Sequence, residues 1–391
     1  MPVGLLSSLS GFLKLTSKTD IDSPVSKLHH NFTTLILLCF CLLLSASSLI
    51  GDPIQCTFND HPLMKEDMIK TYCWLHTTFT LPRHYKGAGQ IYPGIGATTS
   101  NGEFVYHAYY QWVPFVLYLQ AIMFYAPYWL WKMWEGGVVD SASTDLAAPV
   151  MNKEELKGKI EMLGDYLQAS LGQHNKYAMK YLGYEALNLV VTITNICVMD
   201  AFLGGKFISY GTKVFSFAQM EDEDRIDPMI MLFPRMTKCT FRAVGPSGTT
   251  EKLDSLCILP HNILNEKAYL FLWVWLWILL VAGSFSVLWR CIVFFVPFMR
   301  INLLRNYTHG LNNNETKALS TYLSVGDYFL FYLLHKNVSR LAFTDLVRDV
   351  AGRISSRDSE SLEMGDKVRK DSKKYHRMNS PRPTPSGGLW T

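Results

Sequence analysis

Long apolar runs without charge are the feature that most constrains this chain. Residues 32–50 are nineteen residues with no charged side chain, and residues 109–131 form a second uncharged run of twenty-three. Residues 268–289 are the most apolar segment and contain the stretch FLWVWLWILLVAG. A helix needs about 20 apolar residues to cross the ~30 Å hydrocarbon core of a membrane. These three segments are therefore predicted to be transmembrane helices.

A fourth run, residues 182–203, is weaker because it contains Glu185 and Asp200. A buried helix of a soluble domain is one alternative, and a proton relay within the membrane is another. Both acids lie near the ends of the run, where water and lipid headgroups can solvate them. We interpret the run as a fourth span, in which the two acids anchor the helix or pair with a neighbouring group.

The predicted class is an all-α membrane protein with four transmembrane helices, disulfide-linked extracellular loops and a helical cytoplasmic domain. The expected segments are an N-terminal cytoplasmic arm (1–31), the first span (32–50), extracellular loop 1 (51–108), the second span (109–131), a cytoplasmic loop (132–181), the third span (182–203), extracellular loop 2 (204–267), the fourth span (268–289), a cytoplasmic helical region (290–354) and a disordered tail (355–391).

The basic residues indicate the orientation in the membrane. The segments on the side of the two termini hold 25 Lys and Arg, whereas the two other loops hold 12. Basic residues favour the cytoplasmic side, so both termini are predicted to be cytoplasmic in a plasma-membrane protein. The net charge of +4 is too small to indicate nucleic acid as a partner.

Four of the eight cysteines are divided evenly between the predicted extracellular loops. Cys56 and Cys73 lie in the first loop, and Cys239 and Cys257 lie in the second. Disulfides persist in oxidising compartments, so these four residues are expected to be bridged. Free thiols are the alternative. Neither pair has the close spacing typical of a metal site, so no metal is expected.

Catalytic motifs are absent from the sequence. It contains no H-E-x-x-H motif, no P-loop, no G-x-S-x-G elbow and no G-x-G-x-x-G after a strand. We therefore expect neither an enzyme nor a bound cofactor.

The N-terminal arm is amphipathic, because Leu5, Leu9 and Phe12 recur at helical spacing. Such an arm either lies flat in the membrane interface or folds into a pore. The residues alone favour the interface.

An acidic cluster lies in the second extracellular loop. Most such runs are simply solvated, but a ring of acids repeated by every subunit at a pore mouth would concentrate cations. The members of the cluster are Glu221, Asp222, Glu223 and Asp224.

The cytoplasmic region after the fourth span shows two compositions. Residues 315–350 are predicted to form one or two packed helices. From residue 355 the chain is charged and rich in Ser and Pro, which is typical of disorder. Its Lys and Arg are suited to contact anionic membrane lipid.

The second span opens with an aromatic belt followed by a proline. A proline removes a helical hydrogen bond and is expected to kink the span, either as a hinge or as a packing feature. The residues of this stretch are Tyr109, Tyr110, Gln111, Trp112, Val113 and Pro114.

This YYQWVP stretch closely resembles the signature of the innexins, the invertebrate gap-junction proteins related to the pannexins. The resemblance covers roughly residues 1–350. Four further segments look like innexin segments in the same order: IGDPIQC, TYCWLHTTFTLP, DAFLGGKF and DPMIMLFPRMTKCTF.

The resemblance implies that the subunits form a ring around a wide pore. It also implies that two rings, one from each of two adjacent cells, dock through their extracellular loops. The ring would contain identical or related innexin subunits surrounded by membrane lipid. It also implies that the N-terminal arm folds into the pore. By analogy, Cys56 is expected to pair with Cys257 and Cys73 with Cys239.

Three functions are compatible with these features. The first is a gap-junction subunit that passes ions and small metabolites between cells. The second is a hemichannel that rarely docks and releases small solutes. The extracellular loops contain no Asn-x-Ser/Thr sequon, which argues mildly against it because a glycan would obstruct docking. The third is a four-span adhesion protein without a pore.

Overall fold

The computed structural model describes residues 19–57, 66–85, 92–98, 102–144, 146, 153–217, 227–244, 247–308 and 311–378. The chain divides into two compact units. The membrane unit contains Asp22–Trp134 and Leu182–Trp289, and the second unit contains Met1–Ile21, Glu135–Tyr181 and Arg290–Thr391.

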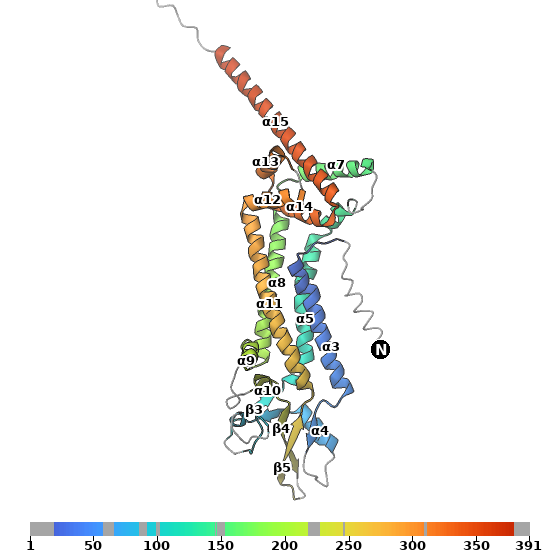
Figure 1. The fold of residues 1–391 in the computed structure, drawn as a ribbon, viewed down its shortest axis with the longest axis vertical. Coiled ribbons are helices and arrows are strands. Elements are labelled where there is room, and N and C mark those ends of the chain that lie inside the picture. Colours follow the sequence, from blue (N-terminus) through green and yellow to red (C-terminus); the bar gives the residue numbers. More distant parts are fainter. Residues whose placement is uncertain are drawn as a thin grey trace, which may run out of the picture. The chain divides into compact units, whose positions relative to one another are not determined.

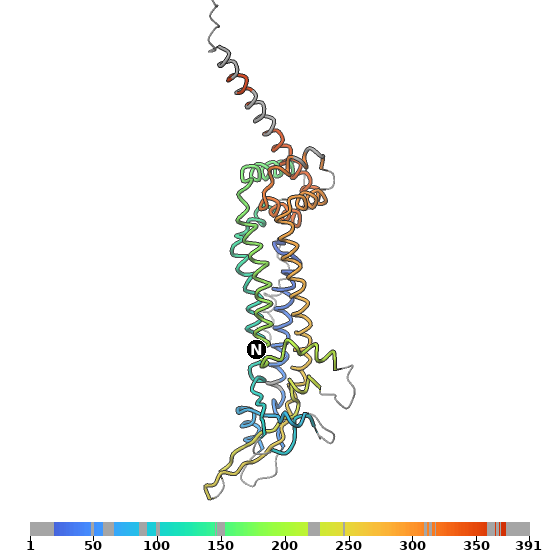
Figure 2. Tube along the Cα trace, turned by 90° about the vertical axis from the view of Figure 1, so that its left-hand side faces the viewer, coloured from blue at the N-terminus to red at the C-terminus, as the bar shows by residue number. Residues whose placement is uncertain are grey.

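Four helical segments of the described residues are long and apolar enough to cross a membrane. The first begins as α2 and continues through a π-helical turn, η1, into α3. Within the membrane unit the four helices run side by side (Figures 1 and 2). Their bounds are Pro24–Lys27 (α2), Leu28–Thr33 (η1), Thr34–Ile50 (α3), Val113–Glu135 (α5), Asn175–Phe202 (α8) and His261–Phe295 (α11).

The packing of these helices follows from their composition. Leu37, Leu117, Met199 and Leu276, one from each helix, are buried in a single hydrophobic cluster. Other apolar side chains of the same helices, such as Phe115, remain exposed. On a membrane helix, exposed apolar side chains can contact lipid or a neighbouring subunit, so they are not exposed to water.

Pro114 does not kink the second span. It is the second residue of α5, where the backbone N–H groups have no acceptor within the helix, so a proline costs no hydrogen bond there. The predicted kink at Pro114 is therefore wrong, and the proline inside the helix is Pro127.

The loops on one side of the bundle form an antiparallel sheet of five strands. The strand order is β1-β5-β4-β2-β3, so strands from the first loop flank the hairpin of the second loop on both sides. We call these strands together with helix α4 the cap. The bounds are Gln55–Thr57 (β1), Glu66–Leu75 (α4), Thr78–Thr80 (β2), Val105–His107 (β3), Met236–Val244 (β4) and Thr250–Ile258 (β5).

Short helices accompany the cap and the ends of the spans. They are Pro82–His84 (η2), Tyr109–Gln111 (η3), Tyr210–Phe217 (α9) and Pro228–Leu232 (α10).

The second unit is helical around α14, an apolar helix that is buried over most of its length. At about 20 Å long, a helix of this length is too short to cross a membrane. The helices of this unit are Val138–Ser143 (α6), Lys153–Ala169 (α7), Pro297–Thr308 (α12), Asn313–Tyr322 (α13), Val325–Asn337 (α14) and Arg340–Met378 (α15).

The disorder predicted from residue 355 is wrong for most of that segment, because α15 continues to Met378. The segment has too few apolar residues to build a core, which suggested disorder. However, Lys, Arg and Glu also have high helix propensity, and the next proline is Pro381. Such a segment can extend from a packed helix into solvent. Residues 379–391 lie outside the described residues.

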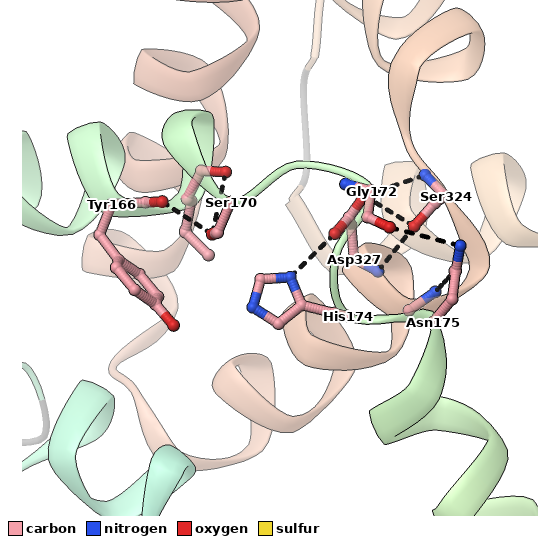
Figure 3. A network of polar contacts seen from close by, with 9 residues as sticks. Tyr166, Ser170, Gly172, His174, Asn175, Ser324 and Asp327 are labelled. Carbon is pink, nitrogen blue, oxygen red and sulfur yellow. Dashed lines mark hydrogen bonds and ion pairs between the residues drawn. The ribbon is translucent and has the colours of Figure 1, made fainter.

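Asp327 connects α14 to the turn between α7 and α8 (Figure 3). Its carboxylate accepts hydrogen bonds from the Gly172 N–H at 2.9 Å, from His174 Nδ1 at 3.0 Å and from the Ser324 hydroxyl at 2.8 Å. Burial alone would raise the pKa of Asp327, but these hydrogen bonds outweigh burial and hold the pKa below 3.8. The ionised carboxylate of Asp327 therefore stabilises this unit above about pH 3.8, and this stability is lost as the pH falls through the lowered pKa.

Replacing Asp327 with alanine is expected to destabilise the second unit by about 3 kcal/mol, because the hydrogen bonds that the buried carboxylate accepts from Gly172, His174 and Ser324 are lost. Hydrogen exchange of α14 amides measures the change. Asp345→Ala is the control, because Asp345 is about half exposed and its ion pair within the described part of the chain is with nearby Arg348. Equal protection of α14 in both variants would contradict the assignment.

Candidate functional site

Two disulfides join the two loops that form the cap. Cys56 on β1 is bonded to Cys257 on β5, across 201 residues of sequence. Cys73 on α4 is bonded to Cys239 on β4, across 166 residues. These are the pairs that the innexin resemblance implies. Each bond ties a segment of the first loop to the hairpin of the second.

The disulfides are the centre of the small hydrophobic core of the cap. The four cysteines are buried together with Ile54, Ile69, Tyr110 and Leu259. The sulfur atoms of Cys56, Cys73 and Cys257 lie within 4.8 Å of one another, so the two bonds are adjacent. Sulfur atoms in a disulfide are not thiolates, and this cluster therefore does not offer the ligands of a metal site.

The signature residues attach this core to the second span. Tyr110 is buried and its ring lies 4.8 Å from that of Trp74 on α4. Its hydroxyl donates to the backbone carbonyls of Cys73 and His76 at 3.5 and 3.4 Å. Gln111 also donates to the backbone carbonyl of Trp74. The signature thus fixes α4, and with it one disulfide, to the start of α5.

The other signature residues contact different surroundings. The Tyr109 ring meets Phe233 edge-on at 5.5 Å. Trp112 is exposed, as expected for an aromatic residue of the membrane interface. Pro114 is the second residue of α5, as described above.

A second attachment joins the residues directly before β4 to α11, and it was not predicted from the sequence. Arg235 donates two hydrogen bonds to the carboxylate of Glu266, at 2.7 and 3.2 Å, and the Glu266 side chain is fully buried. Asn262 donates to the Pro234 carbonyl at 2.7 Å, and the Leu259 N–H donates to the Arg235 carbonyl. Bidentate guanidinium–carboxylate pairs are geometrically specific, so the hairpin has a fixed position on α11.

Lys238 on β4 links the hairpin to the first loop. Its ammonium group forms an ion pair with Asp254 at 2.8 Å and donates to the Gly96 carbonyl and the Thr98 hydroxyl. A charged side chain that is almost buried needs such partners.

His107 on β3 is buried and lies 2.9 Å from the Thr80 hydroxyl on β2. Burial, with a smaller contribution from the positive charge of Lys206, lowers the pKa of His107 from 6.5 to about 4. The imidazole is therefore neutral at physiological pH.

Two groups of predicted site residues lie outside the described residues. The first is the arm, with Leu5, Leu9 and Phe12. The second is the acidic cluster, with Glu221, Asp222, Glu223 and Asp224. Their proposed pore-lining and pore-mouth roles remain predictions.

Comparison with known proteins gives a family for this combination of four spans and a bridged cap. Residues 22–354 match the innexin family. The chain belongs to the innexin family. It is 41% identical to innexin inx2 of Schistocerca americana over 90% of its length and 99% of that protein. It is also 40% identical to innexin inx2 of Drosophila melanogaster, covering 90% and 96% of the two chains, and 39% identical to innexin shaking-B of the same fly, covering 86% and 91%.

Removing the Cys73–Cys239 bond of this innexin (Cys73→Ser with Cys239→Ser) is expected to cost the cap about 2–5 kcal/mol, because the bond closes a very long loop. Hydrogen exchange of β4 and β5 measures the loss. Cys197→Ser is the control, because Cys197 is a free, exposed cysteine on α8. Unchanged protection of both strands in the double variant would contradict this role.

The lowered pKa of His107 predicts a pH dependence of cap stability. Between pH 6.5 and 4 the unfolded chain binds a proton at this residue and the folded cap does not, so stability falls as the pH falls. The loss at pH 5 is expected to be about 2 kcal/mol relative to pH 7.5. Hydrogen exchange of β2 and β3, corrected for the intrinsic pH effect, measures it. His107→Gln should reduce this dependence, and an identical pH profile in the variant would contradict the assignment.

Proposed function

We propose that this innexin assembles with identical or related innexin subunits into a ring and that the ring docks, through the cap, with a ring on an adjacent cell. As an innexin, the chain is a structural subunit of a gap-junction channel. It crosses the plasma membrane several times and lies at cell junctions. The observation that carries the proposal is a cap built from both loops and held by two disulfides on four membrane helices.

The cap supports docking for a physical reason. A binding surface that is ordered before it meets its partner loses less conformational entropy on association. Here both loops are bonded to each other, and the cap is attached to α5 through Tyr110 and to α11 through the Arg235–Glu266 pair. The disulfides also favour a cap on the oxidising, extracellular side of the membrane. With four spans, both termini then lie on the opposite, cytoplasmic side.

The same proposal makes the chain a passive conduit and not an enzyme, with no cofactor. Innexins are channel proteins. A wide polar pore lets solutes cross with their hydration shells, so permeation does not depend on a specific binding site. Within this proposal, the N-terminal arm lines the pore and the acidic cluster Glu221–Asp224 lies at its mouth, where it concentrates cations.

The test is junctional conductance between paired cells that each express only this chain. Pairs are expected to pass current, whereas pairs in which only one cell expresses the chain are not. Current or dye uptake in single cells, with silent pairs, would instead support the non-docking hemichannel. Silence in both, with protein present at the surface, would contradict a homomeric channel and favour the four-span adhesion protein or an obligate partner subunit.

A further inference from the structure

Asn337, the last residue of α14, binds the backbone of the segment that precedes the first span. Its Oδ1 atom accepts a hydrogen bond from the Asp20 N–H at 2.5 Å, and its Nδ2 atom donates to the Asp20 carbonyl at 2.9 Å. The side-chain amide therefore pairs with both backbone groups of one residue, as a residue of a neighbouring strand would. We call these two hydrogen bonds the clamp.

Two further contacts lie beside the clamp. The Lys336 ammonium group is 3.7 Å from the Asp20 carboxylate, and the Thr19 hydroxyl donates to the Asp140 carboxylate on α6 at 3.1 Å. Both contacts are at least partly exposed to solvent, and such contacts contribute little to stability. The clamp is less exposed than the Thr19 bond and joins two groups that are costly to leave unpaired, so it is the stronger contact.

The helix that carries the clamp is fixed at its other end. Asp327, in the first turn of α14, is bonded to the turn between α7 and α8 (Figure 3). At the clamped end, Asn337 Nδ2 also donates to the Leu333 carbonyl of the same helix at 2.8 Å. An amide nitrogen has two hydrogens, so it can make both of its bonds at once. The orientation of the Asn337 amide is therefore determined on both sides.

The clamp lies where the chain passes from one unit to the other. The second unit includes the chain up to Ile21, and the membrane unit begins at Asp22. The next residue, Ser23, caps α2 by accepting a hydrogen bond from the Ser26 N–H. We call residues 19–21 the root of the N-terminal arm, because the arm directly precedes them in the chain. The clamp therefore holds the root to α14, with two residues left before the cap of the first span.

The root determines where the arm starts. Within the proposed function the arm lines the pore, and a segment whose root is not fixed has many more conformations open to it. We propose that Asn337 is a positioning residue for conduction. By holding Asp20 it keeps the root in the position from which the arm lies along the pore wall, and an arm that is not clamped obstructs the pore. This inference rests on the proposed function.

Two substitutions of Asn337 test it in paired cells. Asn337→Ala removes both hydrogen bonds of the clamp. Asn337→Asp keeps the shape of the side chain and can accept from the Asp20 N–H, but it cannot donate to the Asp20 carbonyl. Each variant is expected to lower junctional conductance at least about fivefold at an equal amount of protein on the surface, because the lost bonds release the root.

Asn306→Ala is the matched control. Asn306 is an exposed asparagine on α12 of the same unit. Substitutions of exposed residues are usually close to neutral, so its conductance is expected to stay within about twofold of the unsubstituted pair.

Hydrogen exchange of the full-length protein tests the clamp independently of conduction. In Asn337→Ala the Asp20 amide is expected to exchange at least about fivefold faster, because it has lost its acceptor. The buried amides of Phe329–Leu333 in the middle of α14 are expected to keep their protection. Equal protection of the Asp20 amide in the variant and in the unsubstituted protein would overturn the clamp.

A second tether of the root distinguishes positioning from a general effect on α14. Thr19→Cys and Asp140→Cys replace two side chains that are in contact, and a short membrane-permeant bismaleimide can join them. Added to Asn337→Ala, this cross-link is expected to restore conductance to within about twofold of the unsubstituted pair, because it holds the root to α6. The reagent is expected to leave conductance low in Asn337→Ala with Asp140→Cys alone.

The outcomes separate this inference from the proposed function. If unsubstituted pairs conduct and both Asn337 variants conduct equally well, the positioning role is wrong and the gap-junction function stands. If the variants conduct poorly and the cross-link forms without restoring conductance, Asn337 acts through α14 and not through the root, which also overturns the inference. If unsubstituted pairs do not conduct, the proposed function fails and the positioning role fails with it, whereas the exchange of the Asp20 amide still decides whether the clamp exists.

Discussion

The bond between the two loops is the constraint on which the cap depends. Three of its five strands have only three residues, and strands of that length do not form a stable sheet by themselves. The hydrophobic core of the cap is also small. Cys56–Cys257 and Cys73–Cys239 compensate by restricting the unfolded chain over separations of 201 and 166 residues. Without the disulfides, the short strands β1, β2 and β3 would be bound to the hairpin only weakly.

A bridged cap serves a channel only if its position on the membrane helices is also fixed. Two contacts provide this, and they use different chemistry. In η3, directly before α5, Tyr110 packs its ring against Trp74 of α4 and its hydroxyl donates to the Cys73 carbonyl. On α11, a buried carboxylate, Glu266, holds Arg235 at the base of the hairpin. Because both loops are bonded together, each contact positions the whole cap on the spans that carry it.

The sequence predicted the features that depend on composition and failed where three-dimensional neighbours decide. Hydropathy was sufficient for the four spans, and the even division of the cysteines was sufficient to expect bridges. The residues alone did not say which cysteines pair; the innexin resemblance implied it. Pro114 was misjudged because its effect depends on where the helix begins. The Arg235–Glu266 pair had no local signal, since its members are 31 residues apart and Glu266 is an ordinary acid beside an apolar run.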